Sequence, residues 1–170
     1  MVAADRQFRE FFAAEFGRLR GLGYLLTGDW AQAEELVQDA LVRTYWAWSR
    51  VRGHERPAAY ARKVLVNRHR SLLRRAAVEA RHLRGRRVEE AVEADLGEDG
   101  LVLWSAVRCL PARQRAVLVL RYHEDLSEAE VARLLGLPRG TVKSLAHRGL
   151  ARLRAELGSP AMEQIRGTQR

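Results

Sequence analysis

Residues 127–145 carry a run of helix boundaries that leaves few choices of local fold. Ser127, with Glu130 three residues later, forms a capping box that begins a helix. Gly136 supplies the left-handed residue that ends the same helix. Ala132 in the first helix is small, so a second helix can approach it closely. Val142 and Leu145, six and nine residues after Gly136, stand at the offsets that let the second helix pack across the first. These boundaries and offsets predict a helix-turn-helix that spans Ser127 to Arg154.

The second helix of this motif is predicted to present a polar, cationic outer face. Its members are Arg139, Thr141, Lys143, Ser144, His147 and Arg148. Arg139, Lys143 and His147 fall on one stripe at i, i+4 spacing. Such a helix fits the major groove of DNA, with base edges at its N-terminal half and phosphates at its flanks. The alternative is an ordinary helical hairpin whose basic residues are simply solvated.

Helical patterning dominates the rest of the chain, and no segment alternates convincingly as a strand does. The predicted helices are Asp5–Leu26, Asp29–Ser49, Pro57–Arg75, Leu101–Leu110 and Pro111–Tyr122. Asp29 is predicted to cap the second of these, with Gln32 as its reciprocal partner in a capping box. A short polar loop at residues 50–56 is expected between the second and third helices.

The sequence therefore predicts an all-α protein of two small helical domains joined by a flexible linker, with the helix-turn-helix in the second. The first domain is expected at residues 5–76 and the second at residues 101–157. Residues 77–100 change from arginines to acids with few large apolar side chains, which is typical of a linker. A polar tail is expected at residues 158–170.

The net charge narrows the choice of partner. The chain of 170 residues carries a formal net charge of +9, which favours a polyanion, nucleic acid before an anionic membrane. A solvated basic surface without a specific partner is the alternative. No apolar run approaches the ~20 residues of a membrane span. A single cysteine, Cys109, cannot form an internal disulfide, so a cytoplasmic protein is expected.

The first domain combines basic and aromatic side chains. Its third predicted helix carries Arg62, Lys63, Arg68, His69, Arg70, Arg74 and Arg75, with Tyr60 and Asn67 among them. The second predicted helix ends in the rings of Tyr45, Trp46 and Trp48. This combination suits single-stranded nucleic acid, whose bases stack on rings while its phosphates meet cations. For Trp46 and for Trp48, packing in the core is the alternative.

Three segments carry a resemblance that covers most of the chain. They are AEELVQDALVRTYWAW (Ala33 to Trp48), PAAYARKVLVNRHRSLLRR (Pro57 to Arg75) and LPARQRAVLVLRYHEDLSEAEVARLLGLPRGTVKSLAHRGLARLR (Leu110 to Arg154). In this order they resemble the extracytoplasmic-function (ECF) group of bacterial sigma factors, in the sigma-70 family. The resemblance implies a region-2-like domain and a region-4-like domain that bind core RNA polymerase and direct it to promoters. The implied partners are the β′ clamp helices and β flap of the polymerase, promoter DNA and an anti-sigma factor, with no membrane.

The resemblance also assigns residues to roles. The set implied to dock on the clamp helices is Glu34, Glu35, Gln38 and Asp39. The set implied to hold the −10 element, with the loop at residues 49–56, is Trp46, Trp48, Arg62, Lys63, Asn67 and Arg70. The positions matched to −35 recognition are Lys143, Ser144, His147 and Arg148, beside Arg139 and Thr141. Two residues depart from the family pattern: Leu145 stands where many relatives have Arg, and Gly149 costs a helix about 1 kcal/mol relative to Ala.

Other classes of protein fit the sequence less well. An autonomous helix-turn-helix repressor or activator needs a dimer interface or an effector pocket, and the first domain offers neither clearly. An enzyme is disfavoured because the five histidines lack ligand spacing with carboxylates and no glycine-rich phosphate loop occurs. We therefore expect a non-catalytic initiation subunit without cofactor or metal. Cys109 is expected to be a buried structural thiol, because Val107 and Leu110 are apolar, with a redox sensor as the alternative.

Overall fold

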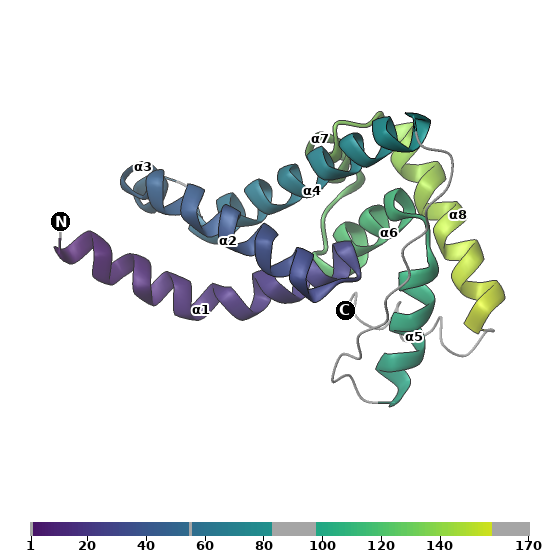
Figure 1. Cartoon of the computed structure of the whole chain (residues 1–170), viewed down its shortest axis with the longest axis horizontal. Helices are drawn as coiled ribbons and strands as arrows, with labels where there is room; N and C mark the ends of the chain where they lie inside the picture. The colour runs from purple at the N-terminus through teal and green to yellow at the C-terminus, as the bar shows by residue number, and fades with distance from the viewer. Residues whose placement is uncertain (1, 55, 83–97, 158–170) are drawn as a thin grey trace. The chain divides into compact units, whose positions relative to one another are not determined.

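The chain folds into helices that gather in two compact units. The computed structural model describes residues 2–54, 56–82 and 98–157, and within these ranges it contains helices and no strand. The units are Met1–Glu90 and Ala91–Arg170. The prediction of an all-α protein is confirmed for the described residues (Figure 1). Residues 83–97, most of the predicted linker, and residues 158–170, the predicted tail, lie outside them.

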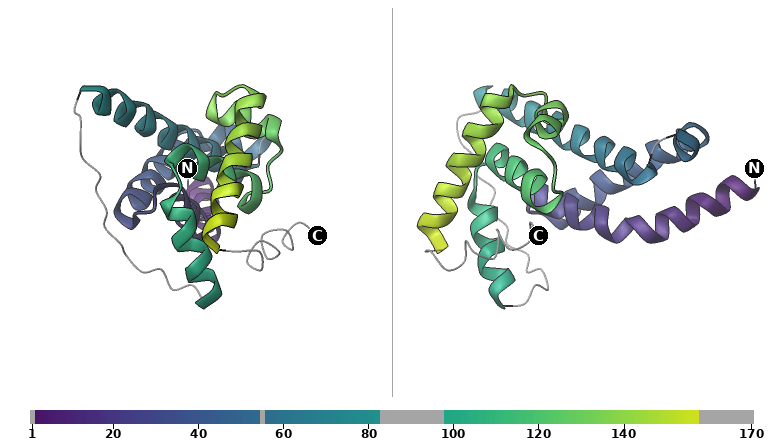
Figure 2. Two further views of the ribbon diagram at one scale, coloured as in Figure 1. Left: turned by 90° about the vertical axis from the view of Figure 1, so that its right-hand side faces the viewer. Right: turned by 180° about the vertical axis from the view of Figure 1, so that it is seen from behind.

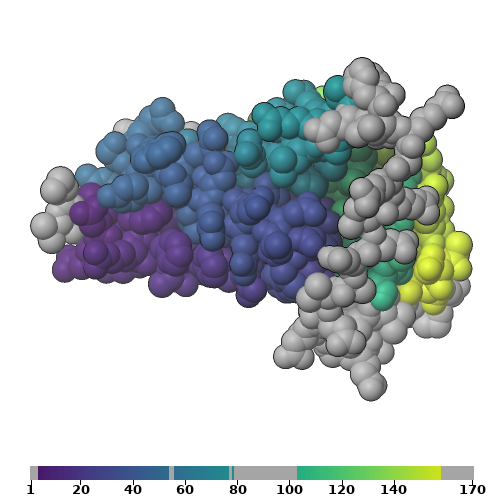
Figure 3. Space-filling model, viewed as in Figure 1, coloured from purple at the N-terminus to yellow at the C-terminus, as the bar shows by residue number. Residues whose placement is uncertain are grey.

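The first unit is a bundle built around its second helix. Its described helices are α1 (Val2–Thr27), α2 (Trp30–Trp46), α3 (Trp48–His54) and α4 (Pro57–His82). Helix α2 packs against both α1 and α4, and the space-filling view shows α1 and α2 side by side (Figure 3). The fully buried side chains of α1, α2 and α4 include Leu22, Leu26, Leu36, Val37, Leu65 and Val66. A Cβ on Gly23 would lie 3.2 Å from Ala33, so the missing side chain lets α1 and α2 approach closely.

The turn from α1 to α2 is closed by side-chain hydrogen bonds. Asp29 caps α2 as predicted, because its carboxylate accepts from the backbone N–H of Gln32 at 2.7 Å. The prediction of Gln32 as the reciprocal partner was wrong. The backbone N–H of Asp29 donates to the hydroxyl of Thr27 at 3.2 Å, and the turn residue between them, Gly28, has a φ of 77°.

Two boundaries in the first unit differ from the prediction. Helix α2 ends at Trp46, and the predicted polar loop is largely helix α3, because Arg50 and Val51 donate to the carbonyl of Ala47 and begin a new turn there. Val51 is fully buried, so one apolar side chain anchors a segment that otherwise reads as polar. Helix α4 extends to His82 rather than ending at Arg75.

The second unit packs around its last helix. Its described elements are α5 (Glu98–Cys109), α6 (Ala112–Leu118), the π-helix η1 (Val119–His123), α7 (Glu128–Leu135) and α8 (Arg139–Leu157). Helix α8 contacts α5, α6 and α7, and Figure 2 shows it running beside α5 and α6. The helix predicted at Pro111–Tyr122 is therefore α6 continued by a π-helical turn, in which the extra residue widens the last turn before the loop.

The helix-turn-helix is confirmed in its local details. The hydroxyl of Ser127 accepts from the backbone N–H of Glu130, and the Glu130 carboxylate accepts from the backbone N–H of Ser127, so the capping box is complete. Gly136 ends α7 with φ 61° and ψ 41°, in the left-handed region. Val142 and Leu145, both on α8, are buried, as their offsets from α7 predict.

Gly149 has a packing reason that the sequence did not reveal. A Cβ at this position would lie 2.9 Å from Leu118 Cδ1 and 3.6 Å from Gln114 Cβ, both on α6. The cost of a glycine inside α8 is thus offset by the close approach of α6 that it permits.

Candidate nucleic-acid interface

The outer face of α8 carries the cationic stripe expected for major-groove binding. Arg139, Lys143 and His147 are exposed at successive turns of the helix. Ser144 and Arg148 are exposed beside them and interact with each other, because the Arg148 guanidinium donates to the Ser144 carbonyl and hydroxyl at 3.3 Å. The remaining predicted member of this face, Thr141, is half-buried.

The start of α8 and the position of Leu145 resolve two oddities of the sequence. Pro138 offers no capping side chain, but its carbonyl accepts from the backbone N–H groups of Thr141 and Val142 at 3.0 and 3.1 Å. Leu145, which departs from the family pattern, is buried on the inner face of α8. It therefore packs in the core of the motif and leaves the outer stripe unchanged.

A hollow between the end of α2, the start of α3 and one side of α4 is the second candidate site. This α2–α4 hollow has a volume of about 670 Å³. Its aromatic lining comes from Trp46, whose surface is 76% exposed, and from Tyr60. The charged lining comes from Arg43, Arg50, Arg68 and Asp39. Exposed rings beside guanidinium groups are what unstacked bases and their phosphates require.

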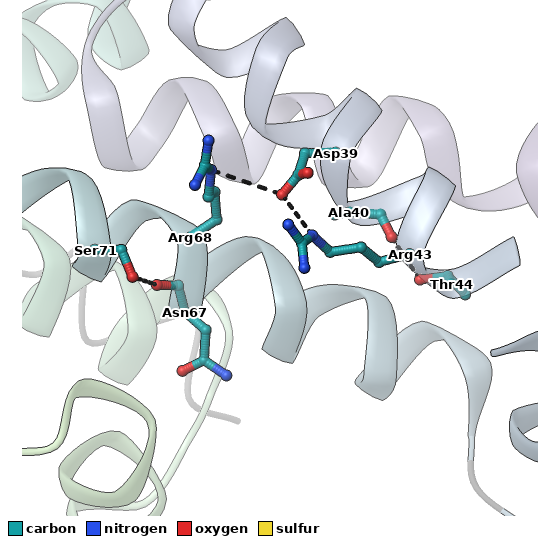
Figure 4. A network of polar contacts seen from close by, with 7 residues as sticks. All are labelled: Asp39, Ala40, Arg43, Thr44, Asn67, Arg68 and Ser71. Atoms are coloured by element: carbon teal, nitrogen blue, oxygen red, sulfur yellow. Dashed lines mark hydrogen bonds and ion pairs between the residues drawn. The ribbon is translucent and has the colours of Figure 1, made fainter. Parts of the chain in front are cut away.

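A polar network crosses this hollow from α2 to α4 (Figure 4). The Asp39 carboxylate lies 2.9 Å from Arg43 Nε on its own helix and 3.7 Å from Arg68 Nε on α4. The carbonyl of Asn67 accepts from the hydroxyl of Ser71 at 3.0 Å, while the Asn67 side chain extends away from Asp39 (Figure 4). Asn67 therefore lines the hollow without its side chain belonging to the ion-pair network.

The hollow gathers part of the residue set predicted to hold a single strand. Trp46 and Asn67 line it. Arg62, Lys63 and Arg70 do not, although all three lie on the neighbouring part of α4 and Lys63 is exposed. Among the charged and aromatic lining residues, Arg43 was missed by the sequence prediction. Tyr60 and Arg68 were named for single-strand binding without a place in the −10 set, and Arg50 lies in the loop expected at residues 49–56. Helical spacing holds the missing signal, because Tyr60, Val64, Asn67 and Ser71 repeat on one face of α4.

Trp48, which was also predicted to hold the strand, does not line this hollow. Its side chain is 6% exposed, and its ring centroid lies 5.1 Å from the centroids of both Phe8 and Phe11 on α1. The core-packing alternative is therefore correct for Trp48, while the high exposure of Trp46 fits the binding alternative. The same cluster includes Tyr45, whose ring lies 4.9 Å from that of Phe8.

The hydroxyl of Tyr45 ties α2 to the start of α1. It donates to the Asp5 carboxylate at 3.0 Å. This hydrogen bond and the negative charge of Asp5 raise the pKa of Tyr45 above its ordinary value of 10.0.

The acidic residues predicted to dock on polymerase do share one side of α2. Glu35 and Gln38 are exposed, while Glu34 and Asp39 are partly covered. Glu34 lies 2.9 Å from the guanidinium of Arg20, which in turn lies 4.4 Å from the ring centroid of Trp30. Because Glu34 and Asp39 are both engaged within the chain, Glu35 is the most accessible carboxylate of the set.

Among the residues that the structure describes, Cys109 and the histidines form no metal site. Cys109, the last residue of α5, is exposed, so the prediction of a buried thiol was wrong. Within residues 2–54, 56–82 and 98–157, no three His, Cys, Asp or Glu side chains are grouped to hold a metal ion. None of the helices in the same ranges is long and apolar enough to cross a membrane.

Comparison with known proteins shows that each of the two candidate sites lies in a segment that matches a family model. Residues 11–78 match the family model of sigma-70 region 2, and residues 101–153 match that of sigma-70 region 4. An RNA polymerase sigma-E factor of Streptomyces antibioticus is 39% identical over 135 residues, which cover 78% of this chain and 74% of that protein. The ECF RNA polymerase sigma factor SigL of Mycobacterium tuberculosis is 35% identical over 139 residues, 78% of each chain. The chain belongs to the ECF group of the sigma-70 family.

The fold of this sigma factor is also found in a solved structure. The sigma factor RpoE of Bartonella quintana, crystallised with the anti-sigma factor NepR, superimposes with a TM-score of 0.72 at 23% identity, covering 91% of this chain and 99% of that one. The first unit corresponds to region 2 and the second to region 4, in the family's order. An autonomous helix-turn-helix regulator is therefore not favoured, because region 2 would then have no role.

Proposed function

We propose that this promoter-directing sigma factor reads a −10 element with the α2–α4 hollow and a −35 element with the outer face of α8, while it docks on core RNA polymerase through the acidic side of α2. The observation that carries the proposal is the combination of a cationic, exposed α8 stripe with a ring-lined hollow in the other unit. One site suits duplex DNA and the other suits unstacked bases.

The −35 contact is assigned to the N-terminal half of α8. Lys143 and His147 lie one turn apart on the exposed stripe, and Arg139 precedes them by one turn. A side chain that reaches a base edge contributes roughly 1–3 kcal/mol of discrimination, whereas a phosphate contact weakens binding to all sequences alike when it is removed. The −10 contact is assigned to Trp46 for stacking and to Asn67 for a base edge, with Arg62, Lys63 and Arg70 supporting the strand from the rest of α4.

The docking surface is assigned to Glu34, Glu35, Gln38 and Asp39, facing cationic groups of the β′ clamp helices, with the β flap as the partner of the second unit. The part of the predicted linker that lies between α4 and α5, residues 83–97, is proposed to let the two units reach both elements. No catalytic step, metal or cofactor is required by this function. An anti-sigma factor is a further expected partner, and the cytoplasm is the expected compartment.

The decisive experiment adds the full chain to core polymerase and sequences the transcript starts from fragmented genomic DNA. A defined pair of motifs upstream of new starts is expected. The absence of new starts would contradict the proposal. The double substitution Lys143→Ala with His147→Ala should reduce the dependence on the upstream motif and leave polymerase binding intact. Arg113→Ala, an exposed arginine of α6 away from that face, is the matched control.

Docking is tested separately by charge reversal. Glu35→Arg should weaken the affinity for core polymerase by about tenfold or more, since it sets like charges against each other across a contact. Glu10→Arg makes the same change on the exposed side of α1 and should have little effect. Equal affinities for Glu35→Arg and the unmodified chain would refute the docking surface.

A further inference from the structure

Asp39 belongs to two surfaces at once. It is part of the acidic side of α2, and its carboxylate also lines the α2–α4 hollow. Among the described residues that line this hollow it is the single acid, beside Arg43, Arg50 and Arg68. An anion inside a site for a polyanion is unfavourable for binding unless it serves another purpose.

The geometry shows what Asp39 does in the unbound chain. One oxygen, Oδ2, meets Arg43 Nε at 2.9 Å and Arg68 Nε at 3.7 Å (Figure 4). The first contact is a hydrogen bond, whereas the second is an ion pair beyond hydrogen-bond distance. Arg43 comes from α2 and Arg68 from α4, so one carboxylate oxygen attracts cations from both walls of the hollow.

A guanidinium group binds carboxylate and phosphate with the same planar fork. Asp39 therefore occupies the position between the two arginines that a phosphate of a bound strand would take. Its hold is weak, because all three side chains are partly exposed, at 52% for Arg43, 40% for Arg68 and 30% for Asp39. Exposed pairs of this kind exchange partners readily.

We propose that Arg43 and Arg68 form a binding site for a backbone phosphate of single-stranded DNA, and that Asp39 is a built-in competitor for that site. This inference rests on the proposed function of the hollow and adds two DNA-binding residues to it. The site lies beside Trp46 and Tyr60, so one nucleotide can place its base on a ring and its phosphate between the arginines.

The same arrangement couples the two surfaces of α2. A cationic group of polymerase that engages Asp39 draws the carboxylate away from Arg43 and Arg68 and leaves them to the phosphate. By linkage, a phosphate that binds the arginines releases Asp39 for polymerase, so each ligand raises the affinity for the other by the same factor. Because the displaced ion pairs are exposed, this increase in affinity is about two- to fivefold.

The test uses the full chain without polymerase and a fluorescein-labelled dT12 oligonucleotide, with affinity measured by anisotropy at several salt concentrations. Asp39→Asn keeps the shape of the side chain and removes its charge. It should bind about two- to fivefold more tightly and steepen the dependence of log K on log salt, by about 0.7 for each additional phosphate that the variant neutralises. The control is Glu35→Gln, which removes one charge from the same helix outside the lining of the hollow. It should give a smaller gain and an unchanged slope.

A double-mutant cycle with Arg68→Gln separates competition from net charge. In that background the gain from Asp39→Asn should fall markedly, because one of the two released arginines is missing. Equal gains in oligonucleotide affinity for Asp39→Asn and Glu35→Gln overturn the inference. It is also overturned if Arg68→Gln leaves the gain from Asp39→Asn unchanged, or if the Asp39→Asn variant does not bind the oligonucleotide. The genomic transcription experiment is independent of these results. If it yields defined promoter motifs while the effects of Asp39→Asn and Arg68→Gln on oligonucleotide affinity are additive, the proposed function stands and this inference alone is refuted.

Discussion

Replacing Gly149 with alanine sets two effects of known size against each other. Alanine inside a helix is favoured over glycine by about 1 kcal/mol. The new Cβ, however, would lie 2.9 Å from Leu118 Cδ1 and 3.2 Å from Leu118 Cγ. Leu118 is itself buried, so relief of this overlap requires a strained side chain or a shift of α6, at a cost of about 1–3 kcal/mol. We expect a net loss of about 1 kcal/mol in the stability of the second unit.

Gly140 on the same helix provides the control. A Cβ built at this exposed position meets no atom within 4 Å beyond its chain neighbours and the adjoining backbone of α8, so Gly140→Ala keeps the gain in helix propensity. It should stabilise α8 by about 0.5–1 kcal/mol. Hydrogen exchange of the full chain, read by mass spectrometry on peptides from α6 and α8, reports this unit separately from the other. Exchange in Gly149→Ala should be about fivefold faster, since about 1.4 kcal/mol corresponds to a factor of ten.

The outcome that refutes the packing argument is slower exchange in both variants. It would mean that Leu118 rotates away at little cost and that helix propensity decides at position 149. A second variant sharpens the test: Leu118→Val removes Cδ1, so adding it to Gly149→Ala should cost less than the sum of the two single changes.

Three further results are expected. Trp48→Ala should destabilise the first unit by about 3 kcal/mol in urea unfolding, because it empties an aromatic cluster. Trp46→Ala should change that stability by less than about 0.5 kcal/mol and should weaken single-strand binding by roughly 1–3 kcal/mol. Similar losses of stability for both variants would contradict the placement of Trp48 in the core and Trp46 on the surface. Ser127→Ala should lower the stability of α7 by about 1 kcal/mol and speed amide exchange in its first turn, and unchanged exchange there would contradict the capping role of Ser127. Asp5→Asn should lower the pKa of Tyr45 toward 10.0 in a phenolate absorbance titration. Because the folded state favours the protonated phenol, the hydrogen bond stabilises the fold below pH 10.0, and this stabilisation is lost as the pH rises through the raised pKa of Tyr45. An unchanged titration would show that Asp5 does not raise the pKa of Tyr45.

Local signals in the sequence predicted the second unit better than the first. The capping box at Ser127 and the left-handed Gly136 involve neighbouring residues, so the pattern contains all the partners that it needs. The buried Val142 and Leu145 followed from their distance to these boundaries. Gly149 was the exception, since its reason lies in Leu118, which is remote in the sequence and close in space.

The candidate sites depended on long-range packing and were predicted in part. Trp46 and Trp48 stand two residues apart and look alike in the sequence, but the break between α2 and α3 at Ala47 turns one ring outward and the other against α1. Asp39 was correctly placed on the acidic side of α2, yet its pairing with Arg68 depends on the packing of α2 against α4. Cys109 has apolar neighbours in the chain, and only the orientation of α5 shows that its thiol is exposed.

The two closed ends of α7 have a thermodynamic consequence for promoter recognition. The capping box and Gly136 fix both limits of the helix through contacts made within the chain, and the turn that follows leads directly into α8. The conformational entropy of the helix-turn-helix is therefore lost when the chain folds and not when it binds DNA. Association of the second unit with a −35 duplex should resemble the docking of a rigid body, with a heat-capacity change set by the contact area alone and no added signature of coupled folding.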